Sequence, residues 1–186
     1  MYFDALSFLE DEREGWAPFE ALLDLRDAVL ERPTDPEGPG HGWSGRDLMV
    51  HLVAWQEQAL AVARELAVNE GSPTRDRLAA DWEARGADPI NAEIHAAFAS
   101  VPTDEVRNRF RTVAGELRGH LTVVPETRWV KNPRNLEFFL ENTMDHYEEH
   151  RPELAAVLEL ASTPGTDDAP GATGGAVGER PGPAAG

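Results

Sequence analysis

The sequence predicts an all-α protein, a four-helix bundle with a long connection between its second and third helices. Apolar residues recur at helical spacing in four long segments, and no segment alternates apolar and polar residues as a half-buried strand does. Stretches rich in proline and glycine, such as ERPTDPEGPGHG, separate the segments. We expect one domain at residues 1–161. Residues 162–186, rich in Gly, Pro and Ala, are expected to form a disordered tail because they offer almost no bulky apolar side chain to bury.

The first predicted helix runs from about Phe3 to Leu30, and its inward-facing side includes one polar residue, Arg26. The connection at residues 74–100 is less regular and is expected to hold short helical pieces or an ordered loop. A third long helix follows, with Thr103 as its expected N-cap.

The second predicted helix has a clear start signal in the stretch WSGRDL. Ser44 is a good N-cap, and Asp47, three residues later, can return a hydrogen bond to the Ser44 amide. Trp43, just before the cap, can pack against Leu48 as a hydrophobic staple. The apolar face of this helix continues until NEGSP ends it.

The fourth predicted helix starts at Asn132, a suitable N-cap, with Pro133 in the first helical position. Pro152 lies further along the same apolar pattern. Because proline removes one amide donor, we expect it to bend the helix just after residue 150.

Composition and charge exclude several classes of site and partner. The chain has no cysteine, which excludes disulfides and thiolate ligands and is compatible with a reducing compartment. With 17 basic and 34 acidic residues, the net charge of −17 argues against nucleic acid and anionic membranes as partners. The first residues carry acids where a signal peptide has basic residues, and no apolar stretch reaches membrane-spanning length. We therefore expect a cytoplasmic protein.

Two histidines, His146 and His150, lie four residues apart in DHYEEH and so share one face of a helix. That face also carries apolar residues, so we expect it to point inward. His51 lies on the apolar face of the second helix and can supply a third ligand in the bundle core. Three neutral imidazoles suit zinc, iron, nickel or copper and leave a coordination position open. The alternative is that these are buried histidines that only hydrogen-bond to neighbours such as Asp47, Asn142 or Tyr147.

The residues around this histidine set have two interpretations each. Asp47, one turn before His51, can orient that imidazole or can serve only as a helix cap. Trp55 and Tyr147 can wall a pocket or can be ordinary core aromatics, and Asn142 is a further candidate for the pocket or for a contact with a ligand. The other histidines are weaker candidates: we expect His41 to be exposed in its loop, His120 to lie near a helix end, and His95 to lie in the connection without a required role.

Three stretches give the chain a resemblance to the DinB-like four-helix bundle superfamily: WSGRDLMVHLVAW, INAEIHAAF and NTMDHYEEHRPEL. The resemblance covers most of residues 1–160. It implies that His51, His146 and His150 bind one divalent metal, with zinc favoured and nickel or iron as alternatives. The superfamily includes mycothiol- and bacillithiol-dependent S-transferases, maleylpyruvate isomerases and the N-terminal domains of ergothioneine synthases. Other relatives hydrolyse or bind small molecules without this metal triad, and many members form homodimers.

The resemblance and the histidine set together predict a metal-dependent enzyme that acts on a small molecule, as a hydrolase or a thiol S-transferase. A low-molecular-weight thiol cofactor would need basic partners for its carboxylates, and the candidates near helix starts are Arg46, Arg128, Lys131 and Arg134. The alternative function is a non-catalytic stress or resistance protein that binds a small molecule or a metal. A third is a homodimeric interaction protein whose bundle surface is functional.

Overall fold

The computed structural model describes residues 4–163, and this part of the chain is all-helical, as the sequence predicted. Most of the predicted tail, residues 164–186, lies outside the described residues. In chain order the helices are α1 (Ala5–Trp16), the 3-10 helix η1 (Ala17–Asp24), α2 (Asp27–Leu30), α3 (Gly45–Val68), α4 (Pro73–Arg85), α5 (Ala87–Phe98), α6 (Thr103–Leu121), the 3-10 helix η2 (Glu126–Arg128), α7 (Pro133–Glu141), α8 (Met144–Glu149) and α9 (Arg151–Ser162).

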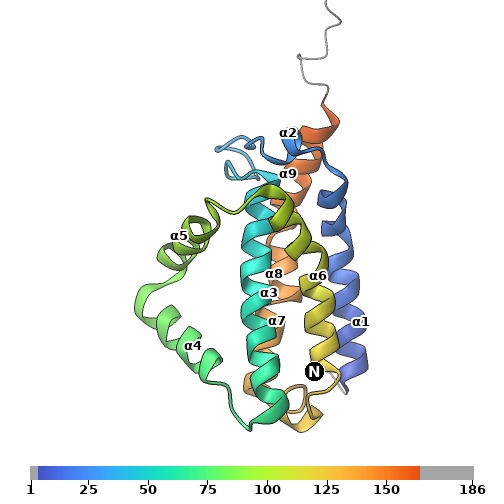
Figure 1. Ribbon diagram of the computed structural model, residues 1–186, viewed down its shortest axis with the longest axis vertical. Coiled ribbons are helices and arrows are strands. Elements are labelled where there is room, and N and C mark those ends of the chain that lie inside the picture. Colours follow the sequence, from blue (N-terminus) through green and yellow to red (C-terminus); the bar gives the residue numbers. More distant parts are fainter. Residues whose placement is uncertain (1–3, 164–186) are drawn as a thin grey trace, which may run out of the picture.

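Figure 1 shows α1, α3, α6 and the column of α7, α8 and α9 running side by side along the long axis of the molecule. The helices α4 and α5 stand to one side of α3. The most extensive packing joins α3 to α6, while α4 and α5 each contact α3 and each other. Because α3 contacts elements on several sides, a residue on it can meet side chains from α5, α8 and α9. Within residues 4–163, no helix combines the length and apolarity needed to cross a bilayer.

The first helical segment is not continuous as predicted. It consists of α1, which leads directly into the 3-10 helix η1, and the short α2. The break lies between η1 and α2 at Leu25, whose backbone is extended with φ −74° and ψ 140°. Pro18 lies in the first turn of η1, where its missing amide removes a helical hydrogen bond. Arg26, predicted to face inward, is exposed because the chain leaves the helix at this point.

The start of α3 matches the predicted capping box. The Asp47 amide donates to Ser44 Oγ over 3.1 Å, and the Ser44 amide donates to Asp47 Oδ2 over 3.0 Å. The next residue, Gly45, lies against α2: a Cβ there would be 2.7 Å from Leu30 Cδ1. A larger residue at this position would therefore require the end of the Leu30 side chain to move.

The connection between α3 and α6 contains the short helical pieces that the sequence predicted. It forms two helices, α4 and α5, separated by Gly86 with φ +74°, a backbone conformation that favours glycine. The predicted N-cap of α6 is one residue off: Pro102 is the N-cap, and Thr103 is the first helical residue. The Thr103 hydroxyl donates instead to Glu31.

The last helical segment is broken twice. Asn132 caps α7 as predicted, by accepting a hydrogen bond from the Asn135 amide. The bend predicted at Pro152 is present, because α8 ends and α9 begins at His150, whose φ of −96° and ψ of 8° are not helical. A second break at Thr143, with φ −130° and ψ −99°, was not predicted.

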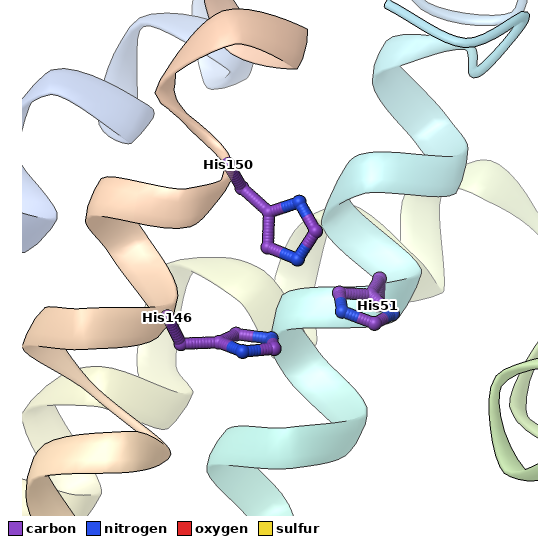
Figure 2. Close-up of side chains that lie close together, drawn as sticks. All are labelled: His51, His146 and His150. Carbon is purple, nitrogen blue, oxygen red and sulfur yellow. The ribbon is translucent and has the colours of Figure 1, made fainter. Parts of the chain in front are cut away.

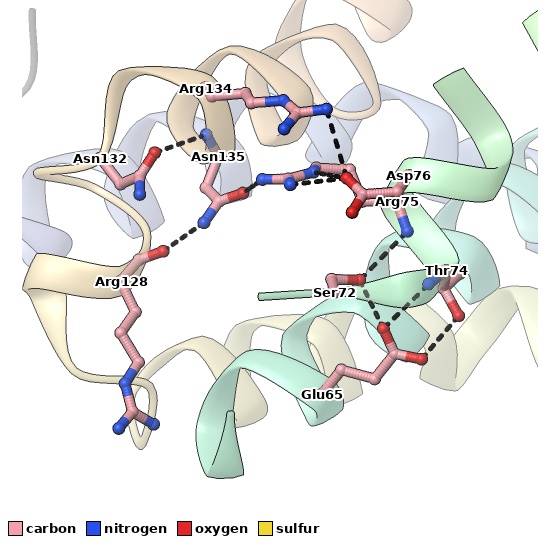
Figure 3. A network of polar contacts seen from close by, with 9 residues as sticks. All are labelled: Glu65, Ser72, Thr74, Arg75, Asp76, Arg128, Asn132, Arg134 and Asn135. Carbon is pink, nitrogen blue, oxygen red and sulfur yellow. Dashed lines mark hydrogen bonds and ion pairs between the residues drawn. The ribbon is translucent and has the colours of Figure 1, made fainter. Parts of the chain in front are cut away.

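A polar network fixes the far end of α3 to the starts of α4 and α7 (Figure 3). Glu65 of α3 accepts hydrogen bonds from Ser72 Oγ and from the amide and hydroxyl of Thr74. Arg75, which is 8% exposed, donates to Asn135 and to Asp76. These bonds determine the direction in which α4 leaves α3.

A buried polar group links α1, α3, α6 and α8 in the core. Glu12, fully buried, accepts a 2.7 Å hydrogen bond from the Tyr147 hydroxyl and a 2.6 Å bond from Arg118. The Gln56 amide donates to the same Tyr147 hydroxyl. Burial raises the pKa of Glu12, and the nearby Arg118 guanidinium opposes that rise.

Replacing Arg118 by Met is expected to destabilise the protein by about 3 kcal/mol at neutral pH, because Glu12 would stay buried without its cation. Urea unfolding measures this difference. The matched control is Arg64→Met, since the 3.6 Å pair of Arg64 with Glu116 is about half exposed, and a loss below about 0.5 kcal/mol is expected there. Equal losses in the two variants would contradict a structural role for the buried pair.

Candidate metal centre

The three predicted ligands come from two parts of the fold. His51 lies in the second turn of α3 and is 1% exposed. His146 lies in α8, and His150 occupies the break between α8 and α9, where it is 7% exposed. Figure 2 shows the three rings converging on the space between α3 and the α8–α9 column. The structure therefore brings together residues that are far apart in sequence.

The three rings form a nearly equilateral triangle. Their centroids are 4.8 Å apart for His51 and His146, 4.6 Å for His51 and His150, and 4.7 Å for His146 and His150. One ring nitrogen of each residue can be chosen so that all three lie within 4.8 Å of one another. Ligand nitrogens of a tetrahedral zinc site are about 3.3 Å apart, given Zn–N bonds of about 2.0–2.1 Å. The nitrogens therefore have to approach one another by up to about 1.5 Å to reach that geometry.

Four of the six ring nitrogens are buried and make no hydrogen bond, and one of these four, Nδ1 of His150, lies 3.6 Å from Glu153. Both nitrogens of His51, Nε2 of His146 and Nδ1 of His150 are buried without a hydrogen bond. Buried polar atoms are nearly always paired, and leaving one unpaired costs about 1–3 kcal/mol. The alternative in which these histidines hydrogen-bond to Asp47, Asn142 or Tyr147 is not realised. The donor set fits a bound metal ion, which would take one nitrogen of each ring.

Burial keeps the imidazoles in the form that binds metal. Burial and the neighbouring imidazoles lower the pKa of His51 to about 2. Burial and His150 lower the pKa of His146 to about 3. The pKa of His150 is also lowered by burial, an effect that Glu153 opposes. All three rings are thus uncharged at neutral pH, as metal coordination requires.

Indole rings enclose the histidines. Trp43 stacks on His150 with centroids 5.5 Å apart and lies 5.0 Å from His51. Trp55, predicted as a pocket wall, meets His51 and His146 at 6.4 Å and 6.0 Å. Trp82 of α4, about half exposed, packs against the outer side of Trp55 at 5.9 Å. This aromatic surround lowers the local dielectric and limits the access of water.

The other predicted pocket residues lie elsewhere. Tyr147 follows His146 by about 100° around α8, so its side chain points into the core, where its ring contacts Trp16 and Phe19. Asn142 ends α7, and its side-chain amide donates to the Phe138 carbonyl. The polar groups of these two side chains bond to Glu12, Gln56 and Phe138 and not to the three histidines.

Asp47 acts as a helix cap and does not hydrogen-bond to His51, whose two ring nitrogens are both unpaired. Its second oxygen, Oδ1, lies instead 3.8 Å from Nδ1 of His95. The capping geometry turns the carboxylate toward α5 and away from the metal centre.

Two further residues lie beside the site: His95, for which the sequence allowed a place in a pocket wall without requiring it, and Glu153, to which it gave no role. His95 of α5 is 6.4 Å from the His51 ring and 5.2 Å from the Trp43 ring, and its side chain is 30% exposed. Glu153 of α9 lies 3.6 Å from His150. The spacing from His150 to Glu153 places the carboxylate one helical turn further on, which is a signal in the sequence itself. His95 becomes recognisable only once α5 is known to be a helix packed on α3.

The four basic residues considered for a thiol cofactor are all engaged away from the histidines. Arg46 donates to the Phe98 and Val101 carbonyls, Arg128 to the Leu66 and Ala67 carbonyls, Lys131 pairs with Glu126, and Arg134 pairs with Asp76. These contacts give no support to a carboxylate-binding cluster at the metal centre.

Comparisons of the chain with protein-family models, curated proteins and solved structures give no match. The fold and the site define the class on their own: an all-helical protein whose described residues contain a group of three histidines able to hold a metal ion. The DinB-like resemblance stays a prediction.

The metal-free protein is expected to lose stability as the pH falls below about 6.5. With folded pKa values of about 2 for His51 and about 3 for His146, only the unfolded state takes up these protons in that range. The stability is therefore full above about pH 6.5 and declines toward the folded pKa values, by up to about 1.4 kcal/mol per pH unit and ring.

Urea unfolding of chelator-treated protein at about pH 7.5 and about pH 5 measures this loss. His51→Leu should reduce the loss, whereas His120→Ala should not, because His120 lies on α6 with its Nδ1 near the Glu116 carbonyl. A wild-type stability independent of pH in this range would show that the buried rings are not held neutral.

Proposed function

We propose that His51, His146 and His150 hold one divalent metal ion, with zinc favoured over nickel and iron, and that the protein is a metal-dependent enzyme acting on a small molecule. The reaction class is hydrolysis or thiol S-transfer, and the architecture is a four-helix bundle of the DinB-like kind. The observation that carries the proposal is the convergence of three histidine rings, four of whose nitrogens are buried without a hydrogen bond.

Three neutral ligands matter for the chemistry. Imidazoles do not neutralise a divalent cation, so the full positive charge stays at the site, in surroundings of low dielectric. A metal ion bound in this way lowers the pKa of a coordinated water or thiol toward neutrality and so supplies a nucleophile. Three protein ligands leave a coordination position for that group, as in catalytic zinc sites.

The surrounding residues have distinct roles in this proposal. Trp43 and Trp55 hold the rings of the ligands and keep bulk water away. His95 is partly exposed and lies beside His51, with Asp47 near its Nδ1. Because His95 is more exposed than the buried ligands, we propose that the substrate approaches along α5.

The second candidate is a non-catalytic stress or resistance protein that binds a metal or a small molecule. The near-complete burial of His51 and His150 favours it, because a tightly enclosed ion is poorly placed to meet a substrate. A cytoplasmic location and a homodimeric state belong to either candidate as proposals. Sedimentation with and without chelator tests whether self-association depends on metal.

Protein purified without chelator is expected to contain close to one divalent ion per chain. Added zinc at about 100 times its dissociation constant should stabilise the chelator-treated protein by about 2.7 kcal/mol, seen as a rise in melting temperature. His150→Ala should lose both the ion and the stabilisation, whereas His120→Ala should keep both. Metal retained in His150→Ala at full stoichiometry would count against the three-ligand site.

Activity assays then separate the candidates. The zinc-loaded protein should hydrolyse members of an ester and amide panel, or couple a low-molecular-weight thiol such as glutathione to an electrophile such as 1-chloro-2,4-dinitrobenzene. Either activity should disappear in His51→Ala and persist in His120→Ala. Tight zinc binding without turnover in either assay would favour the binding protein.

A further inference from the structure

Glu153 is a buried carboxylate in the first turn of α9. It is 8% exposed, and carboxylates are almost never this buried without a partner. Two histidines lie within 4 Å of its carboxylate: Oε2 is 3.6 Å from Nδ1 of His150, and Oε1 is 3.9 Å from Nε2 of His41. Both distances exceed that of a hydrogen bond.

Helix capping does not account for the position of Glu153. It is the third residue of α9, the place from which a glutamate in a capping box reaches back to the N-cap amide. That amide belongs to His150, and it already donates to the His146 carbonyl over 3.2 Å. A favourable interaction with the helix dipole does not require burial either, since an exposed acid in the first turn provides it equally.

The geometry indicates a different partner. Nδ1 of His150 and Oε2 of Glu153 are both buried without a hydrogen bond, and they face each other across 3.6 Å. A movement of about 0.7 Å brings them to hydrogen-bond distance and satisfies both atoms at once.

The ring of His150 has little other freedom. Trp43 stacks on it at an interplanar angle of 23°, which fixes the plane of the imidazole. A stacked ring can still turn over by half a turn, and this would exchange the edge that carries Nδ1 for the opposite edge. A hydrogen bond from Nδ1 to Glu153 selects one of these two orientations.

We propose that Glu153 is the positioning residue of the metal centre: it accepts the Nδ1–H of His150 and so leaves Nε2 of that ring as the metal ligand. This inference rests on the proposed metal centre and adds a residue that orients one of its ligands. Histidine ligands commonly donate their second nitrogen to a carboxylate in this way, which fixes the tautomer and strengthens the ligand.

Of the three proposed metal ligands, Glu153 pairs only with His150. Among residues 4–163, the ion pairs of histidine with a carboxylate involve His41, His95 and His150, and neither His51 nor His146 has one. His41 lies on the loop before α3 with φ +51° and a side chain that is 68% exposed. His41 lies near Oε1 of Glu153, so Oε2 remains for His150.

The test compares the affinity of the full chain for zinc, measured by competition with a chromophoric chelator. Glu153→Ala should weaken zinc binding by about 10–100-fold, since the loss of a residue that hydrogen-bonds to a metal ligand lowers metal affinity by that much. Glu153→Gln should weaken it less, because the amide oxygen can still accept the Nδ1–H. The matched controls are Glu159→Ala and Glu159→Gln, on the exposed side of α9, and they should bind zinc as the wild type does. Equal affinities of folded Glu153→Ala and Glu159→Ala would overturn the proposal.

A second measurement does not depend on the variants folding. Nitrogen-15 NMR of wild-type histidines should show the proton of His150 on Nδ1 in the metal-free protein and zinc on Nε2 in the loaded one. A proton on Nε2, or zinc on Nδ1, would overturn the role of Glu153. If the wild type binds no zinc, the proposed function fails, while the tautomer of metal-free His150 still decides whether Glu153 accepts its proton.

Discussion

Three uncharged imidazoles are held together in an aromatic enclosure, and the rest of the site depends on this constraint. Four of their nitrogen atoms are buried with no hydrogen bond: both of His51, one of His146 and one of His150. Each such atom opposes folding by about 1–3 kcal/mol. The packing of α3 against α6 and the column α7–α9 has to offset this free-energy cost. The same packing keeps the ring centroids within 5 Å of one another. A bound metal ion would take one nitrogen of each ring and so remove part of this penalty.

The contrast with the other buried polar groups sharpens this interpretation. Glu12 is as buried as His51, yet both of its oxygens have partners, Tyr147 on one side and Arg118 on the other. Arg75 is likewise paired with Asn135 and Asp76 (Figure 3). The remaining unpaired atoms are single atoms on separate residues, whereas the histidine nitrogens gather at one point between α3 and α8. Buried polar groups left unpaired in a cluster indicate function more strongly than scattered ones.

Local rules explain what the sequence could predict. The capping box at Ser44 sets the phase of α3 and thereby turns His51 inward, and the four-residue spacing places His146 beside His150. What could not be predicted depends on tertiary contacts. No proline or glycine marks the break at Thr143 in the sequence. The position of His95 became clear only when α5 was seen against α3, whereas the spacing from His150 to Glu153 is visible in the sequence.

The central claim is that these histidines form one metal-binding unit, and X-ray absorption at the zinc edge tests it most directly. The expected spectrum of the zinc-loaded protein contains three imidazole nitrogens at about 2.0–2.1 Å and at least one further light atom in the remaining position. The expected spectrum of zinc-loaded His51→Ala shows fewer imidazole nitrogens bound to zinc than the wild-type spectrum does. A wild-type spectrum dominated by carboxylate or water oxygens, with one imidazole or none, would contradict the account, because the zinc would then be bound on the acidic surface and not between α3 and α8.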